Sequence, residues 1–122
     1  MKSPEYIENR VRSMLIPRIQ DEAVKHSLFK RTEGDELVAR IELLKKVWPA
    51  LRERASKQII PAQDAMDRIK TVGGPYHPEM LKIDWDRFRE THFKAQMIRS
   101  RYTILDIFTD LGNLDTLVEK LF

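Results

Sequence analysis

The side chains best suited to chemistry lie in residues 98–106, which read IRSRYTILD. An apolar stretch there ends at two arginines and a tyrosine, and a threonine that can cap a further helix follows. Guanidinium groups can donate several hydrogen bonds at once, either to helix-end carbonyl groups or to a carboxylate. We predict that these side chains tie two helix ends together, with contact to a phosphate ligand or another domain as the alternative. The candidate residues are Arg99, Arg101, Tyr102 and Asp106.

No other constellation predicts a catalytic, cofactor-binding or metal-ligating site. The three histidines, His26, His77 and His92, do not have the spacing of a zinc site on one helix. We expect His92 to be a partly buried structural residue and His77 to lie on the surface. The sequence has no cysteine, which excludes disulfides, thiolate metal sites and cysteine nucleophiles. Gly73-Gly74 lacks the lysine and serine of a phosphate-binding loop.

The elements that must position these residues are all helical. No segment alternates apolar and polar residues as a strand would, and apolar residues recur at helical spacing along the chain. Helix starts are indicated at Ser3-Pro4, at Pro17 and at Thr103, and Gly112 is placed to end a helix. The sequence therefore predicts an all-α, compact bundle of about six to eight helices without a sheet, in a single domain over residues 1–122.

The longest periodic stretch surrounds Pro49. Its apolar residues are Leu37, Ile41, Leu44, Trp48, Leu51, Ala55 and Ile59. Proline removes one helical hydrogen bond and clashes with the preceding turn. The pattern predicts either one kinked helix or two helices that meet at Trp48-Pro49.

Composition narrows the function classes. Charged residues make up 34% of the chain, but the net charge is only +3 and both signs are interleaved, which favours a solvated surface over a nucleic-acid face. No apolar run reaches the length of a membrane span, and the charged N-terminal segment lacks the apolar core of a signal peptide. We therefore predict a cytoplasmic protein that does not bind nucleic acid and does not cross a membrane.

The second half of the sequence resembles the C-terminal helical region of bacterial-type sn-glycerol-1-phosphate dehydrogenases, in the iron-containing alcohol dehydrogenase and glycerol dehydrogenase superfamily. The most specific likeness is in residues 98–106. The other matching blocks are residues 48–54 (WPALRER), Pro61-Ala62, Gly73-Gly74-Pro75, Pro78-Glu79, Ile83-Asp84 and Leu111-Gly112. The likeness covers about residues 47–115.

The resemblance implies an oxidoreductase with two parts. An N-terminal α/β domain would bind NAD(P), and a helical domain would supply an aspartate and two histidines to a divalent metal, nickel or zinc. The parent reaction would be hydride transfer between nicotinamide and dihydroxyacetone phosphate, a step of phospholipid metabolism. His77 and His92 do not fall on the family's ligand positions, so the resemblance assigns no catalytic, metal or cofactor residue here.

We therefore expect this chain to be the C-terminal segment of such a dehydrogenase, inactive alone, holding no cofactor itself. Its expected partner is the NAD(P)-binding domain of the parent enzyme, and a homo-oligomer is left open. The main alternative is a stand-alone helical protein–protein interaction module, which predicts an exposed apolar patch. A second alternative, a nucleic-acid binder, predicts a contiguous basic face.

Overall fold

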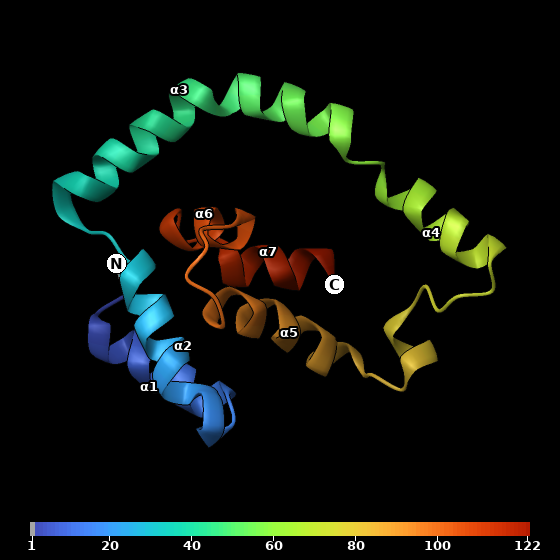
Figure 1. The fold of residues 1–122 in the computed structure, drawn as a ribbon, viewed down its shortest axis with the longest axis horizontal. Coiled ribbons are helices and arrows are strands. Elements are labelled where there is room, and N and C mark those ends of the chain that lie inside the picture. The colour runs from blue at the N-terminus through green and yellow to red at the C-terminus, as the bar shows by residue number, and fades with distance from the viewer. Residues whose placement is uncertain (1) are drawn as a thin grey trace. The chain divides into compact units, whose positions relative to one another are not determined.

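The structure is a computed structural model that describes residues 2–122, and these form helices without any strand (Figure 1). This confirms the predicted all-α fold class. Within the described range, none of the helices combines the length and apolar character that a bilayer crossing requires. The elements are α1 (Pro4–Met14), α2 (Pro17–Lys30), α3 (Gly34–Gln58), α4 (Ala62–Thr71), the 3-10 helix η1 (Pro78–Leu81), α5 (Trp85–Met97), α6 (Ile104–Asp110) and α7 (Leu114–Leu121).

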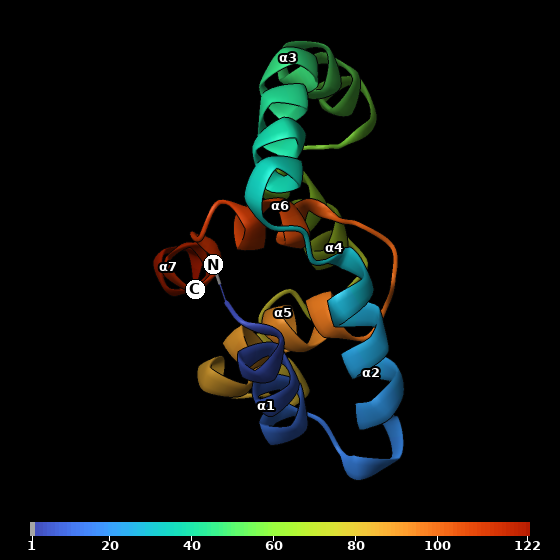
Figure 2. The ribbon, with the colours of Figure 1, turned by 90° about the vertical axis from the view of Figure 1, so that its left-hand side faces the viewer.

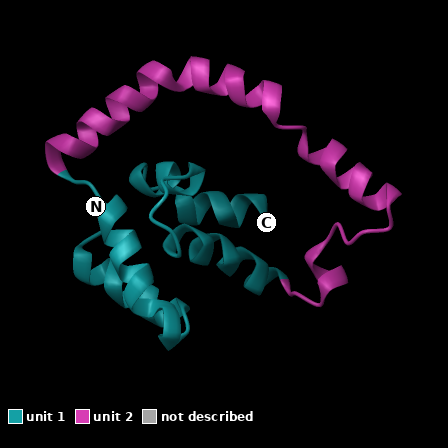
Figure 3. Ribbon diagram, viewed as in Figure 1, with its two compact units in different colours: residues 1–33, 85–122 teal, residues 34–84 magenta. Residues whose placement is uncertain are grey.

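The chain divides into two compact units, coloured separately in Figure 3. Unit 1 consists of residues 1–33 and 85–122, and unit 2 consists of residues 34–84. The helix pairs that pack closely, such as α1 with α2 and α5 with α6, belong to unit 1. The sequence predicts one domain over residues 1–122, and that remains a prediction.

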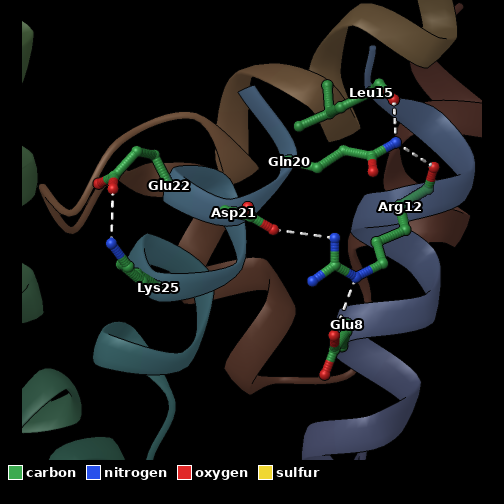
Figure 4. Close-up of polar contacts among 7 residues, drawn as sticks. All are labelled: Glu8, Arg12, Leu15, Gln20, Asp21, Glu22 and Lys25. Carbon is green, nitrogen blue, oxygen red and sulfur yellow. Dashed lines mark hydrogen bonds and ion pairs between the residues drawn. The ribbon is translucent and has the colours of Figure 1, made fainter. Parts of the chain in front are cut away.

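The corner between α1 and α2 follows directly from local sequence signals. Ser3 caps α1, because its hydroxyl oxygen accepts a hydrogen bond from the Tyr6 amide at 3.1 Å. Pro17 begins α2 after a short break, as the sequence predicts. The Gln20 side chain then donates to the carbonyl oxygens of Arg12 and Leu15, at 2.8 and 2.7 Å (Figure 4). Carbonyl groups near the end of α1 thus gain partners from α2.

This corner lets α1 and α2 lie side by side (Figure 2) and form the core of unit 1 with α5. The most buried large side chain is Val11, at 1% exposure. The other buried members of this cluster are Leu15, Ala23, Val24 and Met97, and Ile7, Met14, Leu28 and Phe93 pack against them.

The turn between α6 and α7 is fixed by Gly112, as predicted. Its φ of +72° lies in the left-handed region, where a side chain would be strained. The Gly112 amide donates to the Thr109 carbonyl at 3.0 Å, and the Asn113 amide donates to the Phe108 carbonyl at 2.8 Å. This is a Schellman motif, which ends α6 and lets α7 begin at Leu114.

In unit 2, α3 continues through Pro49 as a single helix, so two separate helices that meet at Trp48-Pro49 are not formed. The predicted kink stays a prediction. No residue of α3 or α4 is buried. The irregular stretch after α4 ends in η1, a short helix that the sequence analysis does not predict. Lys82 ends η1 with a φ of 57°.

Substitutions of two methionines, the buried Met97 and the exposed Met80, test this assignment of the core. Met97 is 5% exposed in unit 1, whereas Met80 is 53% exposed in η1. Met97→Ala should lower the free energy of unfolding by about 2–5 kcal/mol, because it leaves a cavity among packed side chains. Met80→Ala should change it by less than about 0.5 kcal/mol. Urea denaturation followed by circular dichroism measures both, and equal effects would contradict the placement of the core.

Candidate functional site

A buried ion pair joins two helices of unit 1 that are distant in sequence. The Lys30 Nζ atom, in the last turn of α2, lies 2.7 Å from the Asp106 Oδ1 atom, in the first turn of α6. Lys30 is 7% exposed and Asp106 is 2% exposed. Two charges buried this deeply are stable only when they are paired and their remaining hydrogen-bonding positions are filled.

Neighbouring groups fill those positions. Gln96, near the end of α5, donates from its side-chain Nε2 atom to Asp106 Oδ1 at 2.8 Å. The backbone carbonyl oxygen of Gln96 accepts a hydrogen bond from Lys30 Nζ. The Thr103 amide and hydroxyl donate to Asp106 Oδ2 at 2.7 and 2.8 Å. Asp106 thus caps α6 from its first turn, and Thr103 is the N-cap residue that the sequence predicts. We call Lys30, Gln96, Thr103 and Asp106 the buried node after its two buried members, Lys30 and Asp106, whereas Gln96 is partly buried and Thr103 is exposed.

The two predicted arginines lie outside the node. We expected Arg99 and Arg101 to bind helix-end carbonyl groups or a carboxylate such as Asp106. Both side chains are instead exposed, and neither forms a hydrogen bond or an ion pair within the described residues. The carboxylate of Asp106 forms its ion pair with the buried Lys30 ammonium group, and not with either arginine.

Tyr102 lies beside the arginines and does make an internal contact. Its hydroxyl group donates to the Asp110 Oδ2 atom at 2.6 Å, within α6. The loop at residues 98–103 is therefore held at one end by the buried Met97 and at the other by the node and Tyr102. This loop carries both arginines on its surface.

Sequence reasoning missed Lys30, although a signal for it exists. Ala23, Ser27 and Lys30 follow one another at spacings of four and three residues, and all three are buried on one face of α2. A lysine on the apolar face of a helix indicates a buried partner. The hydroxyl oxygen atoms of Ser27 and Thr32, two other buried groups near Lys30 in sequence, have no hydrogen-bond partner within the described chain.

The histidines occupy the places that we expected. His92 is partly buried on α5, where its ring stacks on Phe122 with the ring centres 4.5 Å apart. Its Nδ1 atom lies 3.1 Å from the Phe88 carbonyl oxygen. His77 is exposed in a loop and contacts the edge of Tyr76. Over residues 2–122 no three histidine or carboxylate side chains gather as a metal site would require.

Unit 1 has a shallow groove of about 300 Å³ that is lined by apolar and by charged side chains. The lining residues are Met14, Asp86, Arg89, Glu90, Phe93, Asp115, Val118 and Glu119. Arg10 from α1 donates to Asp115 Oδ1 at 2.5 Å, and Lys2 lies 3.1 Å from Asp115 Oδ2. The hydrogen bond from Arg10 is the main cause that lowers the pKa of Asp115, and Lys2 adds to it.

The buried node predicts how two substitutions change the free energy of unfolding. Asp106→Ala should lower the free energy of unfolding of the chain by about 3–5 kcal/mol, because it leaves the Lys30 charge buried without a partner. Arg101→Ala should lower it by less than about 0.5 kcal/mol, because that side chain is exposed and has no contact to lose. Thermal and urea denaturation of both variants measure the difference. A larger loss for Arg101→Ala than for Asp106→Ala would show that the arginines hold the junction after all.

Asp115 gives a pH prediction. Its pKa is lowered in the folded chain, so its contribution to stability is present above the ordinary aspartate pKa and is lost as pH falls through the folded value. The unmodified chain should therefore have a higher thermal midpoint than Asp115→Asn at pH 7. That difference should vanish well below pH of about 4, where the carboxylate is protonated. A difference that stays constant across this range would contradict the prediction.

Comparisons with known protein families, proteins and structures found no match. The resemblance to the glycerol-1-phosphate dehydrogenases thus stays a prediction that rests on the residue blocks named above.

Proposed function

We propose that residues 1–122 are the C-terminal helical part of an NAD(P)- and metal-dependent glycerol-1-phosphate dehydrogenase, and that they are inactive alone. The parent enzyme would interconvert dihydroxyacetone phosphate and glycerol-1-phosphate. The specific residue block at 98–106 is the basis of the family assignment.

The observation that carries the proposal is the position of Arg99 and Arg101. They lie in the block of greatest likeness, on a loop held by the buried node, yet neither has a partner within the described chain. Two exposed guanidinium groups on an anchored loop are suited to bind a phosphate or a carboxylate from outside the chain. A substrate phosphate and an acidic side chain of a missing domain both have this chemistry.

The residues of this chain do not fit the metal and the nicotinamide that the family uses. The histidines are separated, with His92 packed among aromatic rings and His77 exposed. The described residues offer no ligand set for a divalent ion. We therefore assign NAD(P), the nickel or zinc ion and the hydride transfer to other parts of the parent enzyme, with the NAD(P)-binding domain as the partner of this chain.

Tagging the gene at the end of its coding region in the source cells tests the proposal. The purified polypeptide should be well above 14.5 kDa. It should oxidise NADH or NADPH when dihydroxyacetone phosphate is supplied. A product of 14.5 kDa plus the mass of the tag, or a longer one without this activity, would overturn the proposal.

The same enzyme tests the arginines. Arg99→Gln with Arg101→Gln should raise the KM for dihydroxyacetone phosphate by roughly tenfold or more, which is the size of a lost charge-assisted hydrogen bond. The thermal midpoint of the isolated chain should not change, because neither side chain has an internal contact. Arg18→Gln, an exposed arginine of α2 without a partner, is the matched control and should alter neither quantity.

A second candidate is a stand-alone helical protein–protein interaction module. It is favoured by unit 2, where the 25-residue α3 has no buried residue and exposes several large apolar side chains. Under this function the tagged product has a mass of 14.5 kDa plus that of the tag, lacks dehydrogenase activity and forms a stable complex with another protein.

A further inference from the structure

The apolar residues of α3 follow a heptad pattern. Counting from Leu37, the spacings alternate between four and three residues as far as Ala55. This alternation places Ile41, Trp48 and Ala55 at one core position of a coiled coil and Leu37, Leu44 and Leu51 at the other. We call these six residues the α3 seam.

No residue of the α3 seam is buried. Trp48 is 41% exposed and Leu51 is 44% exposed, and the other four seam residues, Leu37, Ile41, Leu44 and Ala55, are partly exposed. Pro49 lies next to the seam and does not interrupt it, because α3 continues through this residue. A helix in water is stabilised mainly by packing its apolar face, so a seam of this length indicates a second helix as its cover.

Basic side chains border the seam on both sides. At the two positions that flank a coiled-coil core, α3 places Arg40, Lys45, Arg52 and Arg54, together with two valines. Lys45 pairs with Glu42 within α3 at 2.7 Å. Arg52 and Arg54 have no ion pair within the described chain. The acidic residues of α3 all lie away from these flanks.

We propose that the α3 seam binds an amphipathic helix of a separate protein, one whose apolar seam is flanked by glutamate or aspartate. A second copy of α3 does not fit, because its basic flanks would face those of the first copy in either orientation. This inference deepens the interaction-module function and rests on it. It makes no use of the dehydrogenase assignment.

Two synthetic helices of about four heptads test the proposal, with identical leucine and isoleucine seams and with either glutamate or lysine at every flanking position. Trp48 reports binding through a blue shift of its fluorescence, in a Trp85→Phe background that leaves it the sole tryptophan. The glutamate peptide should bind one to one, about tenfold or more tighter than the lysine peptide at low salt. The preference should shrink as salt screens the flanking charges.

Matched variants test the geometry. Leu44→Ser with Leu51→Ser should weaken binding by about tenfold or more, whereas Leu43→Ser, on the same helix but outside the seam, should not. Arg52→Glu with Arg54→Glu should reverse the preference in favour of the lysine peptide. Lys46→Glu with Lys57→Glu makes the same charge change away from the flanks and should preserve it. Because α3 has no buried residue, these variants should keep the helix content of the chain.

Several results would overturn the proposal. The first is equal binding of the two peptides. The second is an equal loss of peptide binding in Leu43→Ser and in the double variant Leu44→Ser with Leu51→Ser. The third is a dimer of the chain alone that this double variant dissociates. A longer native polypeptide that binds neither peptide would show that the seam is covered within that polypeptide. If the tagged chain still forms a complex with another protein while the glutamate peptide fails, the interaction function stands and the seam is not its site.

Discussion

The architecture of unit 1 depends on the ion pair between Lys30 and Asp106. Removing two charges from water is unfavourable, and their attraction offsets that cost only when the geometry is good and other polar groups complete their hydrogen bonds. Here both Asp106 oxygen atoms accept hydrogen bonds, and Lys30 also donates to the Gln96 carbonyl group. These directional contacts bring together the end of α2, the end of α5 and the start of α6.

The node also explains why one short block has two different surfaces. Asp106 and Thr103 point into the network, whereas Arg99 and Arg101 lie in solvent only a few residues away. Unit 2 has the opposite character, since α3 and α4 bury none of their residues. Unit 1 thus contains its own core, whereas α3 and α4 of unit 2 expose large apolar side chains such as Leu51 and Ile69. The proposed helix-binding seam follows from the exposed apolar side chains of α3, whereas the proposed dehydrogenase segment rests on residues 98–106.

Much of the fold could be predicted from local signals. Ser3, Pro17, Thr103 and Gly112 each begin or end a helix by a mechanism that needs only nearby backbone, so the sequence located them. The site was harder to predict because its partners are distant in sequence. Spacing alone cannot show which of several cations becomes buried beside Asp106. An arginine is the more obvious candidate, because its guanidinium group offers more hydrogen-bond donors than a lysine. The spacing of Ala23, Ser27 and Lys30 on α2 was the signal that would have pointed to the lysine.

A double-mutant cycle on Lys30→Met and Asp106→Leu tests the central claim most directly. Each single substitution leaves one buried charge without its partner, whereas the double substitution removes both charges. If the ion pair organises unit 1, the free energies of unfolding should be strongly non-additive. The double variant should be more stable than the sum of the two losses predicts by more than about 1 kcal/mol. Losses that add within about 0.5 kcal/mol would show that the two charges do not depend on each other, and would contradict this account.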